Sequence, residues 1–222
     1  MFTYMRKVYI IMMESKIKER RAFMEKEKML SGQLYDPTDK ELTQLRLRAR
    51  KLTRKYNQTE ADNPEEQQKI LAELLSTNSK LPFFEAPIYF DYGCFTTFGE
   101  NCMANFHFTV LDCCPITIGD NVFIGPNCTL AAPIHPLCPQ ERNVRIREDG
   151  SLFDLEYAKP IVIGSDCWIA SNVVICGGVT IGEGCVIGAG SVVTRDIPPH
   201  SLAVGNPCRV LREITEADLM GK

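Results

Sequence analysis

Three histidines are the residues of this sequence best suited to acid–base chemistry: His107, His135 and His200. An imidazole titrates near neutral pH, so it can take a proton from a hydroxyl group when a second group fixes its orientation. His200 follows two prolines and is expected at the surface, and His107 is expected to have an outward or structural role. His135 lies in the stretch AAPIHPLCPQERN, where the neighbouring residues leave it open between a catalytic base and a loop residue.

The distribution of charge offers a second clue to chemistry. Residues 1–80 carry 17 Lys and Arg against 12 Asp and Glu, whereas residues 81–222 carry 8 against 16. The acidic second part argues against nucleic acid as a partner. Arg195, Arg209 and Arg212 stand out in it, and they favour a phosphate-bearing ligand, with a solvated capping segment as the alternative. This part of the chain also carries a six-residue repeat typical of a β-helix, in which one full turn takes about 18 residues. We therefore expect Arg195 and Arg212 to share an edge of that β-helix.

The sequence carries no pattern for a membrane segment, a disulfide framework or a metal centre. No apolar run approaches the ~20 residues that span a bilayer, and VYIIMM is too short for a signal peptide. The ten cysteines form no C-x-x-C pair and no Cys/His group with zinc-ligand spacing. We therefore expect a cytoplasmic protein with no metal and no membrane partner.

A period of six residues organises the part of the chain that must position these groups. From residue 116 the hexads read ITIGDN, VFIGPN and CTLAAP, and after an interruption IVIGSD, CWIASN, VVICGG, VTIGEG, CVIGAG and SVVTRD. This repeat is the signature of a parallel β-helix, in which each hexad forms one short strand and one corner. The aliphatic residue fills the interior, and the residue two positions before it must be small. Cys128, Cys167 and Cys185 are therefore expected in the core.

The period and its interruptions predict the limits of the β-helix. A weaker repeat through Tyr92, Phe98, Ala104 and Val110, with two extra residues around positions 113–114, extends it backwards. We expect roughly four coils over residues 83–200. A long loop leaves them at about residues 131–160, and loops of this length are usually functional.

The flanking segments are expected to differ in structure. Residues 24–82 are predicted to form a helical module that covers one end of the coils. In it, TDKE at 38–41 reads as a capping box, NPEE at 63–66 starts a second helix with Asn63 as cap, and an earlier helix over about 15–30 ends at Gly32. Residues 1–23 are expected to be a poorly ordered extension, and residues 201–222 a C-terminal capping segment.

Several stretches resemble the maltose and galactoside O-acetyltransferases of the hexapeptide-repeat superfamily. They include MANFHFTVLDCCPITIGDN, HPLCPQERN and the tract that begins KPIVIGSDCWIASN, together with the helical module. The module, the A-N-F segment and the H-P pair make the resemblance more specific than a hexapeptide tract does. It implies a left-handed parallel β-helix, a homotrimer with active sites between subunits, acetyl-CoA as co-substrate and a sugar as acceptor.

The resemblance also implies roles for individual residues. His135 matches the histidine that removes the proton from the sugar hydroxyl, and Asn105 matches a residue that contacts the acceptor and the active site. The positions that match coenzyme contacts are Trp168, Ser171, Ala189, Thr194, Arg195, Arg209 and Arg212. The positions that match acceptor contacts are Asn105, Asp91, Asp112 and an aspartate of the helical module, either Asp36 or Asp39.

The expected function is therefore acetyl-CoA-dependent O-acetylation of a sugar. No serine or cysteine nucleophile with a neighbouring base is recognisable, which favours direct transfer over an acyl-enzyme. A backbone N–H near Ser171 is the expected donor to the oxyanion. Two alternatives stay open: a hexapeptide acyltransferase for another small acceptor, such as an antibiotic, serine or an amino sugar, and a non-catalytic β-helix scaffold.

Overall fold

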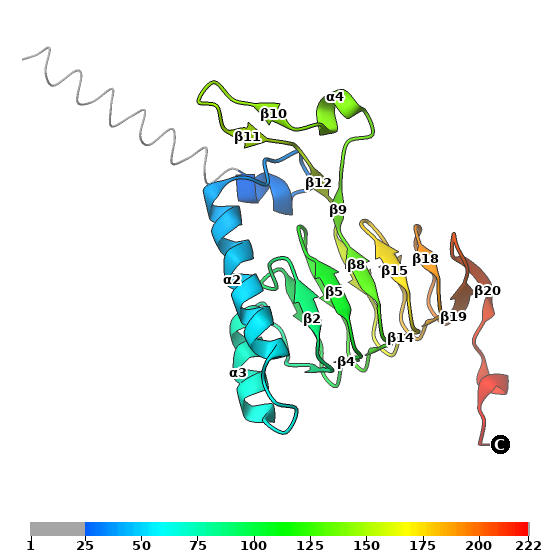
Figure 1. The fold of residues 1–222 in the computed structure, drawn as a ribbon. Coiled ribbons are helices and arrows are strands. Elements are labelled where there is room, and N and C mark those ends of the chain that lie inside the picture. The colour runs from blue at the N-terminus through cyan, green and yellow to red at the C-terminus, as the bar shows by residue number, and fades with distance from the viewer. Residues whose placement is uncertain (1–24, 222) are drawn as a thin grey trace, which may run out of the picture.

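Short strands of two to five residues wind into a left-handed parallel β-helix, with helices at one end and an arm on one side (Figure 1). The computed structural model describes residues 25–221, and the expected extension over residues 1–23 lies outside them. The predicted fold class is confirmed: hexapeptide coils, an N-terminal helical module and an excursion between two coils are all present.

The coils stack into three flat faces. The seven-stranded face consists of β1 (Phe83–Phe84), β4 (Met103–Ala104), β7 (Phe123–Ile124), β14 (Trp168–Ile169), β17 (Val186–Ile187), β19 (Ser201–Val204) and β20 (Arg209–Glu213). The five-stranded face consists of β2 (Ile88–Phe90), β5 (Phe108–Leu111), β8 (Thr129–Ala131), β15 (Val174–Cys176) and β18 (Val192–Val193). The four-stranded face consists of β3 (Thr96–Phe98), β6 (Ile116–Ile118), β13 (Ile161–Ile163) and β16 (Thr180–Ile181).

The first coils are longer than the sequence period predicts. Phe90, and not Tyr92, pairs with Val110, because two residues are added to the corner after β2 as well as to the corner at residues 113–114. Tyr92 lies in that corner with its side chain buried. Each coil contributes one strand to the five-stranded face, so the β-helix has five coils where roughly four were expected.

The cysteines of the hexads are core residues, as predicted. Cys128, Cys167 and Cys185 are at most 1% exposed, and all cysteines in residues 25–221 are free thiols. Burial raises the pKa of each of these three thiols. As protonated thiols, they donate hydrogen bonds from Sγ to carbonyl groups of the next coil, for example from Cys128 to the carbonyl of Ala170 at 3.0 Å.

Two of the three histidines are corner residues. His107 and His200 have φ of 60° and 53°, in the left-handed region that asparagine and glycine tolerate best. Asn127 and Asn172 have the same conformation in later coils, with φ of 59° and 60°. Both histidine side chains are exposed, which confirms the outward placement expected for them.

The helical module packs on the first coil. α2 (Lys40–Asn57) contacts β2, and the Tyr56 hydroxyl donates to the carbonyl of Phe84 at 2.7 Å. The N-cap of α2 is Asp39, whose carboxylate accepts from two backbone N–H groups, so the predicted capping box on Thr38 is wrong by one residue. α3 (Pro64–Leu74) is capped by Asn63 as predicted. Of the earlier helix, only residues 25–30 are described, and Gly32 follows with φ 74°.

The predicted long loop is an ordered arm, residues 132–160. It contains β9 (Pro133–Ile134), α4 (Pro139–Arg142), β10 (Arg145–Ile146), β11 (Leu152–Phe153) and β12 (Tyr157–Ala158). β9 pairs with β12 and β10 pairs with β11, both antiparallel. A bridge between Tyr35 and Glu156 joins the arm to the helical module.

The C-terminal segment closes the last coil. β19 still runs parallel to β17, with Leu202 beside Val186, so the β-helix extends past the predicted limit at residue 200. β20 then turns back antiparallel on β19, and a 3₁₀ turn, η1 (Glu216–Asp218), follows. The antiparallel return gives the stack a terminal strand that is not continued by another coil.

Candidate functional site

The arm holds His135 opposite a carboxylate. His135 follows β9 and Glu156 precedes β12, and the pairing of Ile134 with Tyr157 places the two residues across from each other. The Nε2 atom of His135 lies 3.7 Å from Glu156 Oε2. The imidazole is 50% exposed and the carboxylate 12% exposed. An exposed ring with a carboxylate behind it is the arrangement of an oriented general base.

Glu156 is held from the side of the helical module. The Tyr35 hydroxyl donates to Glu156 Oε1, and the two residues exchange backbone hydrogen bonds. Burial raises the pKa of Glu156, while the Tyr35 hydrogen bond and His135 act in the opposite direction. The sequence analysis missed Glu156 and Tyr35. Their partnership joins positions 121 residues apart, and no local pattern marks it.

Asp36 lies next to this pair, whereas Asp39 does not. Asp36 forms an ion pair with Arg147 of the arm, and Arg147 also donates to Thr38 Oγ1 at 3.0 Å. The guanidinium of Arg147 stacks on Phe153, 4.5 Å from the ring centre. Because the Asp39 carboxylate caps α2, Asp36 is the aspartate that the fold leaves beside Glu156.

A second arginine of the arm is incompletely satisfied. The guanidinium of Arg145 also stacks on the ring of Phe153, 4.8 Å from the ring centre. Its Nε and Nη2 atoms are buried without a hydrogen-bond partner within residues 25–221. Buried donors without acceptors are rare in folded proteins because each costs free energy. Arg145 therefore marks a place where a further acceptor group is expected.

Asp91 and Asp112 occupy different environments. Asp91 is half-buried at the end of β2, where burial raises the pKa of its carboxyl and Arg46 and Arg50 lower it. Asp112 is fully buried and accepts hydrogen bonds from Tyr92 N, Phe95 N and Thr96 Oγ1. The expectation that Asp112 contacts the acceptor is not met by this geometry, because the extra residues of the corner turn its side chain inward.

Removal of the Asp112 carboxylate should destabilise the corner. We expect Asp112→Ala to lower the free energy of unfolding by about 2–4 kcal/mol, since three donors lose their acceptor. Burial raises the pKa of Asp112 from 3.8 to about 6, so the folded protein binds this proton more tightly than the unfolded chain does. Its contribution to stability therefore falls as the pH rises through that range, and the variant should lose this dependence.

Urea unfolding at pH 4 and pH 7, followed by circular dichroism, measures both effects. Asp62→Ala is the matched control, because Asp62 is an exposed aspartate outside the β-helix. Equal stability of the Asp112 and Asp62 variants would show that the corner does not depend on the buried carboxylate.

Three of the residues matched to coenzyme contacts, Trp168, Ser171 and Ala189, lie on the seven-stranded face or at its edge. Asn105, Ser171 and Ala189 lie at the edge between the seven-stranded and five-stranded faces. There the Gly190 N–H donates to the Ser171 carbonyl at 2.9 Å. Trp168 points outward from β14 and is 54% exposed. It belongs to an apolar ladder on the seven-stranded face, formed by Phe83, Met103, Phe123, Trp168, Val186 and Leu202.

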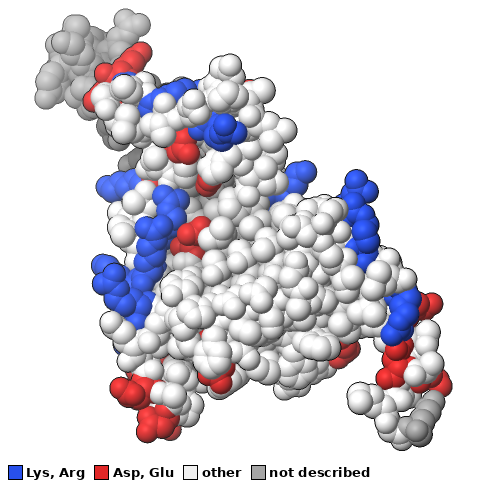
Figure 2. Space-filling model, turned by 45° about the vertical axis from the view of Figure 1, so that its right-hand side comes forward, with Lys and Arg blue, Asp and Glu red and all other residues white. Residues whose placement is uncertain are grey.

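The arginines lie near the last coil. Arg209 and Arg212 are exposed on β20, and Arg195 is exposed in the turn after β18. Arg195 and Arg212 therefore do not share an edge as predicted, because β20 runs antiparallel and breaks the coil spacing. Arg212 is paired with both carboxylate oxygens of Asp218. Figure 2 shows a broad uncharged face of the β-helix, with Lys and Arg gathered at its two ends.

The two predicted catalytic residues are attached at opposite edges of the five-stranded face, one where its strands begin and the other where they end. Asn105 precedes β5, whereas the arm with His135 leaves after β8 (Figure 1). Asp91 follows β2, Thr194 follows β18 and the arm follows β8, so all three lie at the edge where the strands of this face end. At this edge Leu111 and Cys176 both pair with Ala131, the last residue of β8. Three steps along a strand at ~3.3 Å each separate the edges by about 10 Å.

Two other features of residues 25–221 bear on the class of site. No group of three or more His, Cys, Asp or Glu side chains in this range has the arrangement of a metal site. No helix in the same range is long and apolar enough to cross a membrane.

The chain is similar to known acetyltransferases over most of its length. Residues 28–77 match the maltose acetyltransferase hexapeptide capping motif, residues 160–195 the bacterial transferase hexapeptide (six repeats), and residues 115–135 the hexapeptide repeat of succinyl-transferase. Galactoside O-acetyltransferase of Escherichia coli K12 is 41% identical over 192 residues, covering 86% of this chain and 90% of that protein.

Solved structures give the same result. A maltose O-acetyltransferase from Clostridium difficile 630 superposes with a TM-score of 0.78 at 45% identity, covering 86% of this chain and 98% of that one. A galactoside acetyltransferase in complex with coenzyme A superposes with a TM-score of 0.77 at 38% identity, covering 87% and 92%.

Proposed function

Because the chain belongs to the maltose and galactoside O-acetyltransferase family, we propose that it moves the acetyl group of acetyl-CoA to a hydroxyl group of a sugar, with His135 as general base. It is an acyltransferase with acetyl-CoA as co-substrate. The observation that carries the assignment of the base is the exposed imidazole of His135, backed by the shielded carboxylate of Glu156.

The pair suits direct acetyl transfer. His135 takes the proton from the attacking hydroxyl, the hydroxyl oxygen bonds to the thioester carbonyl carbon, and the C–S bond then breaks. The proton passes from the imidazolium to the departing thiolate, while Glu156 stabilises the imidazolium. The backbone N–H of Ser171 is the proposed donor to the oxyanion. Burial raises the pKa of the nearby Cys113 thiol, which argues against an acyl-enzyme on it.

The coenzyme is proposed to lie along the β-helix, away from the arm. Trp168, Ser171 and Ala189 would contact the pantetheine arm, and Thr194 is proposed to contact the coenzyme from the opposite edge of the five-stranded face. Arg195, Arg209 and Arg212 would face the phosphates, because exposed guanidinium groups bind phosphate oxygens in a bidentate manner. Asp36, Asp91 and Asn105 are proposed contacts of the sugar.

We propose a homotrimer whose sites form between neighbouring chains. Within one chain, Asn105 and the root of the arm lie at opposite edges of a face, which supports a site in which a neighbour's edge meets His135. The apolar ladder supports such a contact, since Phe83, Phe123 and Trp168 are each more than 50% exposed.

Mixed assemblies test the shared site. Chains with His135→Ala and chains with Asn105→Ala should each be nearly inactive alone. When both are refolded together, roughly a quarter of the interfaces of a randomly mixed trimer combine an intact His135 with an intact Asn105 from its neighbour. Thiol release should then reappear. Failure to regain activity in assemblies proven to be mixed would place both residues in one chain's site.

Replacement of Arg209 tests the placement of the coenzyme. We expect Arg209→Ala to raise the apparent KM for acetyl-CoA about tenfold, the effect of losing one charge-assisted hydrogen bond. Arg212→Ala should have a smaller effect, because Asp218 already occupies the Arg212 guanidinium. Arg142→Ala is the matched control, because it removes an exposed arginine of the arm, away from the proposed coenzyme contacts. A KM change confined to the sugar would contradict this placement.

A thiol-release assay with acetyl-CoA tests the function itself. Maltose, glucose, galactosides and amino sugars are the acceptors to compare, with serine and an aminoglycoside as acceptors of other classes. Acetylation of a sugar hydroxyl, identified by NMR, supports the proposal. Transfer confined to serine or the aminoglycoside, or no transfer to any acceptor, would overturn it.

A further inference from the structure

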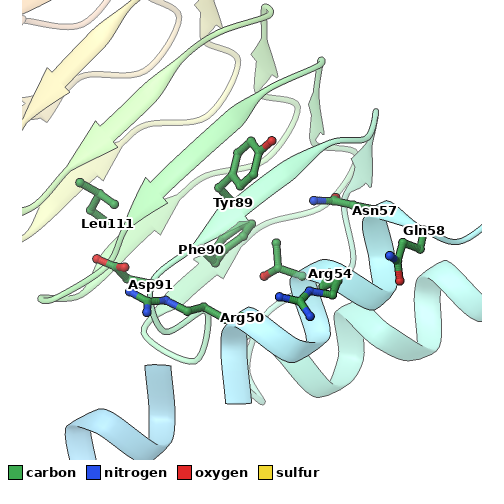
Figure 3. A pocket seen from close by; sticks show the side chains of 9 residues that line it. Arg50, Arg54, Asn57, Gln58, Tyr89, Phe90, Asp91 and Leu111 are labelled. Carbon is green, nitrogen blue, oxygen red and sulfur yellow. The ribbon is translucent and has the colours of Figure 1, made fainter. Parts of the chain in front are cut away.

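A pocket lies between α2 and the outer side of the first two strands of the five-stranded face (Figure 3). Its volume is about 430 Å³, which is within the range of small-molecule sites. The residues of the wall that matter here are Arg50, Arg54, Gln58, Tyr89, Asp91 and Leu111. Apart from Asp91, none of them has a place in the mechanism above.

The pocket adjoins the root of the arm at one end. Asp91 follows β2, and Leu111 of β5 pairs with Ala131, the last residue of β8, from which the chain enters the arm. A molecule whose reacting hydroxyl faces His135 therefore has room to continue past Asp91 into the pocket. The pocket is in that sense an extension of the acceptor site.

The far end of the pocket carries an unbalanced positive charge. Figure 3 shows Arg50 beside Asp91 at one end, and Arg54 and Gln58 on the other side of Tyr89. Asp91 interacts electrostatically with Arg50. The Arg54 guanidinium has no hydrogen-bond or ion-pair partner within residues 25–221, whereas the Lys55 side chain of the same helix is paired with Glu66.

The wall between these charges is apolar and partly aromatic. Tyr89 points outward from β2 and is 47% exposed, and Leu111 on β5 lies further along the wall, next to Asp91 (Figure 3). Pockets of this kind hold a ligand through apolar contact and use a few polar groups to fix its orientation. A tyrosine ring offers a flat surface to the C–H side of a sugar, and a guanidinium offers paired donors to a carboxylate or phosphate.

We propose that this pocket selects an acidic acceptor: a saccharide whose second unit carries a carboxylate or a phosphate that Arg54 binds. The proposal rests on sugar acetylation as the proposed function and names the class of sugar. Asp91 and Arg50 hold hydroxyl groups near the reacting unit, Tyr89 contacts the second ring, and Arg54 binds its anionic group.

Direct binding tests the pocket independently of acetyl transfer. Calorimetric titration without acetyl-CoA would compare maltose, the maltose derivative whose second ring is a glucuronate, and maltose 1-phosphate, so that carboxylate and phosphate are distinguished. We expect at least one acidic sugar to bind about tenfold more tightly than maltose, the lower range of a charge-assisted hydrogen bond. In Arg54→Gln this preference should fall to about onefold.

Lys51→Gln is the matched control, because it removes one positive charge from α2 without touching the pocket wall. It should keep the preference for the acidic sugar. Equal binding of all three sugars, or the same loss in the Lys51 and Arg54 variants, would overturn the proposal. If the acidic sugar binds selectively but no sugar is acetylated, the pocket stands and the proposed function fails.

Discussion

Replacement of His135 by alanine is expected to lower the rate of acetyl transfer by about 10²–10⁴-fold, the range for loss of a general base. The imidazole is the half-exposed member of the His135–Glu156 pair and so the one that can meet a hydroxyl group. The proposed coenzyme contacts lie on the β-helix and not on the arm. The thiol-release rate should therefore fall while calorimetric binding of acetyl-CoA persists.

His200→Ala is the matched control for this variant. His200 is also exposed and also near an acidic residue, with Nε2 3.6 Å from Glu183 Oε1. It lies at a corner of the last coil, so its loss should leave turnover unchanged. Unchanged turnover in His135→Ala would remove the histidine from the mechanism, and a loss of acetyl-CoA binding would assign it to the coenzyme site instead.

Glu156→Gln is expected to lower kcat on the order of 10²-fold, with little change in the KM for acetyl-CoA. The glutamine keeps a similar shape and can still accept from Tyr35, but it carries no charge to stabilise the imidazolium. The same assay measures it, and circular dichroism checks the fold. Asp149→Asn, at an exposed carboxylate of the arm, is the control. Equal kcat in both variants would contradict the role of Glu156.

The pH dependence gives a separate test of Glu156. Because burial raises the pKa of this carboxyl, protonation should remove its charge at a higher pH than for an exposed glutamate. Activity should fall as the pH drops, because protonation of the imidazole removes the base and protonation of Glu156 removes the charge that stabilises the imidazolium. In Tyr35→Phe the hydrogen bond that lowers the pKa is lost, so the acid limb should move to higher pH. An acid limb that stays in place would show that Tyr35 does not act through Glu156.

The local features of the fold were predictable from the residues because they depend on near neighbours. The aliphatic period sets the strands, small residues such as Cys128 and Cys185 fit the interior beside them, and Asn63 caps α3. Errors arose where two signals competed within a few positions. Asp39 and Thr38 could both cap α2, and Phe90 and Tyr92 could both start the first coil.

The site was predictable only in part. His135 could be singled out from the break in the repeat and from resemblance, but its partner could not. Asp112 illustrates the opposite error: its position matched a contact of the acceptor, yet the longer corner buries it among three donors. A match in sequence identifies a residue, whereas the direction of its side chain depends on the backbone around it.

The sequence by itself determined the β-helix, its inward cysteines, the helical module and the place where the chain leaves the coils, because each follows from side-chain periods and turn residues within a few positions. Only the tertiary structure decided that Glu156 and Tyr35 support His135, that Asp36 meets Arg147, and that Asn105 starts from the far edge of the face. These contacts join distant segments, and their geometry depends on coil register and on how the arm folds back, which no short stretch of sequence contains.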